Sequence, residues 1–231
     1  MDHEGEAPVG EVDGSTALRG GGLLLRRWRA EDLPALLRAH DDPAMRRWLA
    51  TRVSGPDGAA DWLEAQRTGW AAGTRFGFAV TEAGRADRPG GAPEDGGPGA
   101  GPGGELLGNI VLKRPDPLNG TAEVGYWTTA PARGRGVASR ALTVLTDWAF
   151  TRFAASGLTR LELLHQVDNA ASCRVAEKCG YALARVIPAL PPDHPLEGHV
   201  HARQAPGAAL SRSAGRRAAA AGTGGGRATG R

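Results

Sequence analysis

A glycine-rich junction between a predicted strand and a predicted helix most constrains what this chain can fold into. The strand covers residues 121–129, the junction is Arg-Gly-Arg-Gly at 133–136, and the amphipathic helix covers 136–153. A further strand is predicted over 159–165. This strand–helix–strand order favours parallel pairing of the two strands with a right-handed crossover.

The remaining patterns surround this unit with short strands and helices. They predict strands at 23–28, 74–82, 105–113, 181–188 and around Val200, and helices at 30–39, 43–50, 59–71 and 170–179. The strands before the junction form an antiparallel meander. We therefore expect a mixed α/β (α+β) sheet in a single domain over residues 22–203.

The glycines and prolines gather in three segments, at 1–21, 84–104 and 204–231. None of these segments has enough apolar side chains to offset the entropy cost of ordering. We expect a disordered N-terminal segment, a flexible insertion between two hairpin strands, and a disordered basic tail.

Charge and composition exclude several classes of protein. The net charge of +3 comes from the tail: six arginines and no acidic residue lie from Arg203 onward, leaving 22 basic residues against 25 acidic ones in the rest of the chain. A mildly acidic domain repels the phosphate backbone of nucleic acids, so we expect no nucleic-acid partner. Only the basic tail would favour such a partner.

No apolar run of about 18 residues exists to span a membrane. An acidic N-terminus and only two cysteines favour a reduced, cytoplasmic protein.

The junction itself predicts an anion site. Glycines allow several backbone N–H groups to converge, and the N-terminus of a helix adds positive partial charge. Arg133, Arg135 and Arg140 supply full charges to match a phosphate. Nucleotide motifs fit poorly, because no Lys-Ser/Thr pair follows the loop and His165 stands where a dinucleotide site needs an acid. A glycine-rich loop with solvated arginines is the alternative.

At this point the residues resemble a family. Arg133, Gly136 and Ala138 match the [Q/R]-x-x-G-x-[G/A] acetyl-CoA signature of the GNAT N-acetyltransferases, at the strand–helix junction where that signature belongs. The segment from Asn169 through Ser172 to Tyr181 resembles the N-x-x-S-x-x-x-x-E-K-x-G-F/Y motif of the RimJ/RimL ribosomal-protein acetyltransferases.

Two upstream segments agree with this resemblance. Residues 123–127 (EVGYW) are similar to the family's "iGYw" strand, and residues 23–32 (LLLRRWRAED) are similar to its usual opening L-R-x-x-x-x-x-D. The resemblance covers roughly residues 23–203, with four motifs in the expected order.

The resemblance implies the GNAT fold, in which two parallel strands splay apart and acetyl-CoA lies in the gap as cosubstrate, with no metal. The pantetheine arm would pair with backbone at 127–129 and with Asn169, and the N–H groups of 134–139 would hold the pyrophosphate. The residues assigned to acetyl-CoA are Trp127, Thr128, Thr129, Arg133, Gly134, Arg135, Gly136, Val137, Ala138, Ser139, Asn169 and Ser172.

Acetyl transfer to an amine needs a base for the amine proton and a proton donor for the departing thiolate. Many GNAT enzymes use a Tyr as donor, but that position is Ala176 here. The RimJ/RimL resemblance assigns the role to Ser172, which would also stand at the third position of a helix capped by Asn169. For the base, Glu123, His165 and water remain open, since Glu123 also fits a surface strand and His165 a structural histidine.

We therefore expect an N-acetyltransferase that transfers acetyl from acetyl-CoA by direct attack of a primary amine in a ternary complex. The acceptor is either a protein N-terminus or a small molecule. The alternative is a non-catalytic acyl-CoA-binding module. A homodimer is common in the branch that the chain resembles, but no residue here argues for one.

Overall fold

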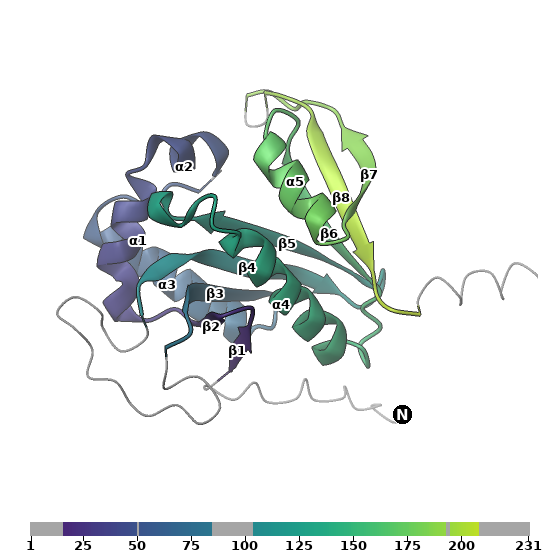
Figure 1. Cartoon of the computed structure of the whole chain (residues 1–231), viewed down its shortest axis with the longest axis horizontal. Coiled ribbons are helices and arrows are strands. Elements are labelled where there is room, and N and C mark those ends of the chain that lie inside the picture. Colours follow the sequence, from purple (N-terminus) through teal and green to yellow (C-terminus); the bar gives the residue numbers. More distant parts are fainter. Residues whose placement is uncertain (1–15, 50, 85–103, 193–194, 208–231) are drawn as a thin grey trace, which may run out of the picture.

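Eight strands in the described part of the chain form one sheet, in the order β1-β2-β3-β4-β5-β6-β8-β7 (Figure 1). The computed structural model describes residues 16–49, 51–84, 104–192 and 195–207. The strands are β1 (Ala17–Gly20), β2 (Leu23–Arg27), β3 (Arg75–Glu82), β4 (Leu106–Asp116), β5 (Thr121–Thr128), β6 (Arg160–Gln166), β7 (Ala182–Ile187) and β8 (Gly198–Gln204). The α-helices are α1 (Leu33–His40), α2 (Pro43–Trp48), α3 (Gly55–Ala71), α4 (Val137–Arg152) and α5 (Ala170–Lys178), with short 3₁₀ turns η1 (Ala30–Asp32) and η3 (Ala130–Ala132).

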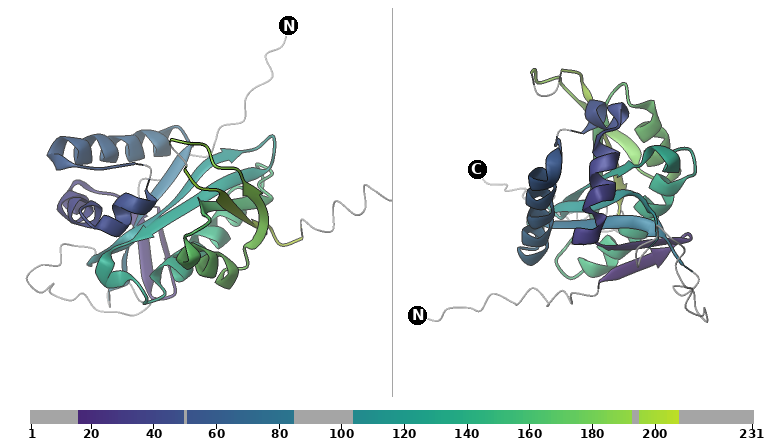
Figure 2. Two further views of the ribbon diagram at one scale, coloured as in Figure 1. Left: turned by 90° about the horizontal axis from the view of Figure 1, so that it is seen from above. Right: turned by 90° about the vertical axis from the view of Figure 1, so that its left-hand side faces the viewer.

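The predicted strand–helix–strand unit is confirmed. β5 and β6 are neighbours and run parallel, with α4 between them in the chain. The other adjacent strands pair antiparallel, so the predicted mixed sheet is also confirmed. α1 and α3 cover one face of the sheet, and α4 and α5 cover the other (Figure 2).

The prediction of disorder over residues 1–21 is wrong at its C-terminal end. Residues 17–20 form β1, which pairs antiparallel with β2. The turn between the two strands is Gly21-Gly22, and both glycines have positive φ, 58° and 75°. Two such residues make the tight turn that matches the twist of a hairpin, so the Gly pair orders this segment rather than loosening it.

The other predicted disordered segments fall mostly outside the described residues. These are residues 1–15, 85–103 and 208–231. The predicted tail began at Gln204, which is instead the last residue of β8. Of the helices in the described part, none combines the length and hydropathy that a membrane span requires.

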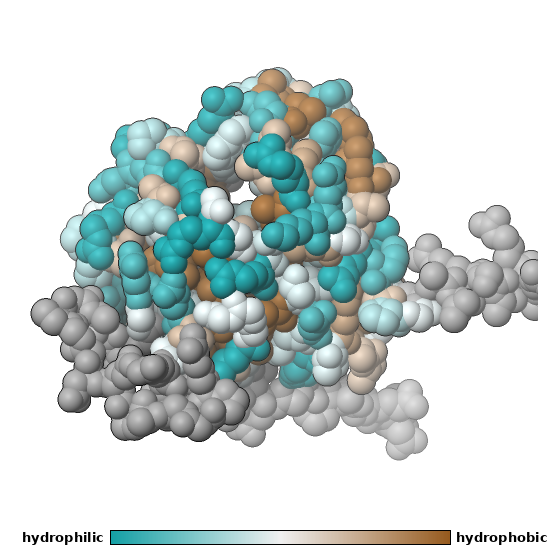
Figure 3. Space-filling model, in the orientation of Figure 1, coloured by the Kyte–Doolittle hydropathy of each residue, from teal (hydrophilic) through white to brown (hydrophobic). Residues whose placement is uncertain are grey.

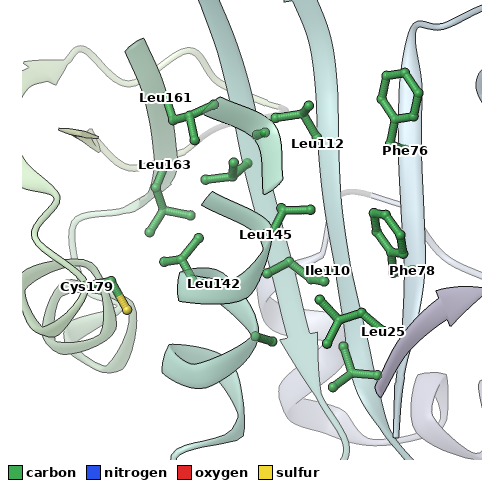
Figure 4. Close-up of a cluster of buried hydrophobic side chains, with 14 of the residues drawn as sticks. Leu25, Phe76, Phe78, Ile110, Leu112, Leu142, Leu145, Leu161, Leu163 and Cys179 are labelled. Carbon is green, nitrogen blue, oxygen red and sulfur yellow. The ribbon is translucent and has the colours of Figure 1, made fainter. Parts of the chain in front are cut away.

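The larger core lies between α4 and the sheet. Leu142 and Leu145 of α4 are fully buried and point toward Ile110, Leu112 and Leu161 of the strands (Figure 4). A second apolar cluster lies on the other face, where α1 and α3 meet the sheet. Its members include Trp28, Leu36, Leu63, Ala79 and Trp127.

A buried ion pair accounts for the opening motif. Two nitrogens of Arg26 on β2 each donate to a carboxylate oxygen of Asp32, both at 2.7 Å, and the two side chains are only 8% and 9% exposed. Asp32 also accepts from the backbone N–H of Arg29 at 2.9 Å. This bidentate geometry satisfies the carboxylate and fixes the turn from β2 into α1.

Candidate active site

The parallel strands β5 and β6 pair only over their first halves. Their register ends at Val124 opposite Leu163. Beyond that point β5 continues against β4 as far as Thr128, and β6 continues against β8 as far as Gln166. Within the described ranges, residues 125–128 have no strand on their other side. The two strands diverge in Figure 1, and the surface is hollowed above this gap, between α2 and α5 (Figure 3).

The backbone of β5 presents alternate groups to this opening. The N–H of Thr129 donates to the carbonyl of Leu107 at 2.9 Å, toward β4. The direction of the main-chain N–H and C=O groups alternates along an antiparallel ladder. Those of Trp127 therefore also point toward β4, whereas those of Tyr126 and Thr128 point toward the gap. Of the predicted segment 127–129, Thr128 therefore offers its main-chain groups to a ligand. The indole of Trp127 is buried on the face of the sheet that α1 and α3 cover, and its ring lies 6.0 Å from the ring of Trp28.

The glycine-rich loop that was predicted to hold a phosphate, here called the cradle (residues 134–139), lies at the start of α4. Gly134 and Gly136 have φ of 73° and 71°, a backbone conformation that only glycine adopts without strain. Among the residues that the structure describes, none gives a hydrogen-bond acceptor to the backbone N–H groups of 134–139; the first N–H of this region that is bonded belongs to Arg140. A Cβ on Gly134 would meet nothing within 4 Å, so there is open space above the loop.

The arginines of this loop surround the cradle but have partners of their own. Arg133 is ion-paired with Asp42, which caps α2, and Arg135 is ion-paired with Glu82 at the end of β3. Arg140 donates to the carbonyl of Gly21 at 2.6 Å, which attaches the β1–β2 turn to α4. Both ion pairs are partly exposed, so they are weak enough to exchange for a phosphate.

The structure brings Ser172 together with a residue that the sequence analysis did not single out, Tyr126. The phenol of Tyr126 donates to the hydroxyl of Ser172 at 3.2 Å. Burial raises the pKa of Tyr126 to about 12, against a smaller opposing effect of the bond to Ser172, so the phenol stays protonated and remains a donor. The alternation of side chains along β5 could have indicated this position. It places the side chain of Tyr126 on the same face of the sheet as Ala122 and Val124, toward α4 and α5.

Asn169 is the predicted cap of α5. Its side-chain oxygen accepts from the backbone N–H of Ser172 at 3.1 Å, so Ser172 does stand at the third position of the helix. The amide nitrogen of Asn169 has no partner within the described ranges and remains available to a ligand. Capping therefore orients the Ser172 hydroxyl without engaging it.

The structure does not support Glu123 as a base. One oxygen of its carboxylate accepts from Lys113 at 2.7 Å, and the other is ion-paired with Arg114. Burial acts to raise the pKa of Glu123, but the hydrogen bonds and charges of Lys113 and Arg114 outweigh it and hold the pKa below its usual value. Glu123 also lies opposite Glu162, in the paired half of β5 and β6 rather than in the opening.

The other candidate base, His165, has its ring nitrogens directed elsewhere. Its Nδ1 lies 2.8 Å from the carbonyl of Gln166, and its Nε2 lies 3.7 Å from the sulfur of Cys173. Burial lowers the pKa of His165, with smaller contributions from His201 and His199, so the imidazole is neutral at pH 7. His165 thus belongs to a cluster of its own, on the β8 side of β6.

An opened parallel strand pair lies beside a row of backbone N–H groups at a helix start, and such a helix start favours the binding of an anion. Residues 22–182 match the family model of the acetyltransferase (GNAT) domain. The chain belongs to the GNAT acetyltransferase family.

Individual relatives are consistent with this membership. Over 80 residues the chain is 41% identical to the ribosomal-protein-serine acetyltransferase of Escherichia coli K12, a match that covers 34% of this chain and 42% of that protein. The chain therefore matches less than half the length of that relative. Among solved structures it is similar to RimJ of Mycobacterium smegmatis in complex with CoA-disulfide (TM-score 0.63, 22% identity, covering 90% of this chain and 94% of that one). It is also similar to a GNAT-family acetyltransferase of Bacillus anthracis (TM-score 0.65, 18% identity, covering 82% and 98%).

Proposed function

We propose that this chain is an acetyl-CoA-dependent N-acetyltransferase whose acceptor is the α-amine of a protein N-terminus. The observation that carries the proposal is the row of N–H groups at 134–139, which have no acceptor among the described residues and lie next to the free edge of β5. N–H groups that converge at the start of a helix carry positive partial charge, and a pyrophosphate would be attracted to them. The name of the E. coli relative supports a ribosomal protein as acceptor.

Several residues would hold the cosubstrate. The cradle would hold the pyrophosphate, and Arg133 and Arg135 would exchange their carboxylate partners for it. The main-chain groups of Thr128 and the amide nitrogen of Asn169 would bind the pantetheine arm. When bound, acetyl-CoA supplies an activated thioester carbonyl, and the chain's part is to orient that carbonyl and stabilise the charge that develops during transfer.

Ser172 would assist the departing sulfur. Its N–H is fixed by Asn169 and its oxygen accepts from Tyr126, so the hydroxyl hydrogen is free to point at the sulfur. A hydrogen bond to a thiolate stabilises it as charge develops. The amine attacks directly and loses its proton to water, because the carboxylate of Glu123 is held by two cations.

Binding of acetyl-CoA by the purified chain is the first test. At a ligand concentration of about 100 Kd, linkage gives roughly 2.7 kcal/mol of stabilisation, which raises the melting temperature by about 5–10 °C in a domain of this size. Gly134→Glu places a carboxylate in the open space above the cradle and should abolish the shift. Gly73→Glu is the matched control, since Gly73 also has positive φ (66°) and open surroundings, but lies at the end of α3.

Turnover is tested separately, by thiol release and mass spectrometry of the acceptor. We expect acetylation of peptides that carry a ribosomal-protein N-terminus and slower reaction with small primary amines. Faster reaction with small amines than with these peptides would show that the acceptor is a small molecule and not a protein N-terminus. Binding without acetylation of any amine would favour the alternative, a non-catalytic acyl-CoA-binding module.

A further inference from the structure

Three histidines and a cysteine converge on one side of the sheet, next to α5. His165 lies on β6, His199 and His201 lie on β8, and Cys173 lies on α5. One nitrogen or sulfur atom from each lies within 4.8 Å of those of the other three. The strand register explains the convergence: His165 is directly opposite His199, and His201 follows two residues later on the same face.

The distances suit a tetrahedral metal. The sulfur of Cys173 lies 3.7 Å from Nε2 of His165 and 3.4 Å from Nδ1 of His199. A zinc ion with a Zn–S bond of about 2.3 Å and Zn–N bonds of about 2.0–2.1 Å separates sulfur and nitrogen by about 3.6 Å in a tetrahedron. The remaining pairs of ligand atoms lie within 4.8 Å of one another, against about 3.3 Å for two nitrogens in such a tetrahedron, so the side chains would move closer together on binding the ion.

Backbone carbonyls orient two of the rings for this purpose. Nδ1 of His165 lies 2.8 Å from the carbonyl of Gln166, and Nδ1 of His201 lies 3.1 Å from the carbonyl of Tyr181. Each Nδ1 must carry the hydrogen to make these bonds, which leaves each Nε2 with a lone pair. Metal-binding histidines are commonly held in this way, by a second bond from the ring to a carbonyl.

His201 adds a buried ring nitrogen to this cluster. Its side chain is buried, at 2% exposed, and its Nε2 has no hydrogen-bond partner among the described residues. A buried acceptor without a partner is destabilising, and a bound cation in the cluster would satisfy it.

We propose that Cys173, His165, His199 and His201 form a Zn²⁺ site. One thiolate and three imidazoles are ligands that zinc prefers, and with all four positions filled by protein the site is closed and structural rather than catalytic. The metal links β6, β8 and α5. Because Cys173 directly follows Ser172, it holds the first turn of α5 against the sheet beside the opening. No metal is expected from the sequence, so a Zn²⁺ ion at these four residues would overturn that expectation.

The test uses the full chain, purified without a histidine tag and stripped with a chelator. Zn²⁺ is titrated in competition with a chromophoric chelator, and Co²⁺ serves as a spectroscopic probe. We expect one Zn²⁺ per chain, a higher melting temperature with Zn²⁺, and Co²⁺ spectra with the strong visible bands of a tetrahedral site and a thiolate charge-transfer band. Cys173→Ala should lose the charge-transfer band and most of the affinity, while Cys179→Ala, which alters the other thiol, should keep both.

A second variant distinguishes loss of a ligand from a folding defect in Cys173→Ala. His199→Gln changes a partly exposed ligand and should weaken Zn²⁺ binding at least 10-fold while the circular dichroism spectrum stays that of the parent. The proposal fails if the wild-type chain binds no Zn²⁺. It also fails if both ligand variants bind Zn²⁺ as tightly as the Cys179→Ala control does. None of these readouts depends on acetyl transfer, so they stand apart from the proposed activity.

Discussion

The phenol oxygen of Tyr126 lies 3.2 Å from the hydroxyl oxygen of Ser172, and the two residues meet across the opening between β5 and α5. Tyr126 comes from the strand whose edge is free, and Ser172 from the helix that follows the neighbouring strand. Their contact depends on the divergence of β5 from β6, so it links the shape of the opening to the group proposed to assist the leaving sulfur.

Removing the hydroxyl of Ser172 should slow transfer without weakening cosubstrate binding. We expect Ser172→Ala to lower kcat about 100-fold, the lower end of the range for a positioned proton donor. Tyr126→Phe should lower kcat on the order of 10-fold, the value of one hydrogen bond that orients the donor. Because both act through one group, the double variant should match Ser172→Ala alone. Steady-state kinetics with acetyl-CoA affinity measured in parallel would check this, and full kcat in Ser172→Ala would remove the assignment.

Alkaline pH should destabilise the chain through Tyr126. Its pKa is about 12 in the fold against 10.0 for a free phenol, so the folded state holds the proton more tightly. This stabilisation is therefore complete below pH 10 and is lost as the pH rises from 10 through 12. Urea unfolding across this window should show a falling stability, and Tyr126→Phe should fall less. The chain has only two tyrosines, so phenolate absorbance can follow the titration directly; ionisation of both near pH 10 in the native state would contradict this.

Loss of Asp32 should destabilise the whole fold. Arg26 is buried with it, so Asp32→Ala leaves a guanidinium without a counter-charge, which costs about 3–5 kcal/mol. Asp61→Ala, at an exposed position of α3, should change the free energy of unfolding by less than about 0.5 kcal/mol. Chemical denaturation of the two variants measures the difference, and equal small effects would show that the buried pair contributes little.

Glu123→Gln should affect stability more than catalysis. We expect kcat at neutral pH within about threefold of the wild type, whereas loss of a true general base costs on the order of 100-fold or more. The pKa of Glu123 is lowered in the fold, so its stabilisation is present above the ordinary value of 4.5 and is lost as the pH falls below it. The variant should therefore lose stability at pH 7 and unfold with a weaker dependence on acid. A 100-fold loss of kcat with unchanged stability would restore Glu123 as the base.

The sheet and the cradle could be predicted from sequence because their signals are local. Periodicity located β5, α4 and β6 to within a residue or two, and the glycines of 133–136 marked the N-terminus of α4. Composition does not predict β1, because residues 1–21 are rich in glycine and acids, although a Gly pair between two short extended segments is itself a hairpin signal.

Side-chain contacts between distant elements could not be predicted in the same way. The partners of Glu123 follow from the register of β4 against β5, and Lys113 is directly opposite it. The cluster around Cys173 needs β8 to lie beside β6, and nothing in the residues of β8 shows which strand it pairs with. Register and strand order belong to the whole sheet, so the ion pairs and clusters that depend on them appear only in the structure.

The position of β8 also sets the order in which the molecule can be completed during synthesis. It is the last strand along the described chain, yet it lies between β6 and β7 and pairs with both. Until residues 198–204 have left the ribosome, β7 has no place in the sheet and β6 has only its short contact with β5. A nascent chain thus carries residues 134–139 and Ser172 before β8 has been made, so the part of the sheet that contains β6 and β7 is complete only after residues 198–204 emerge.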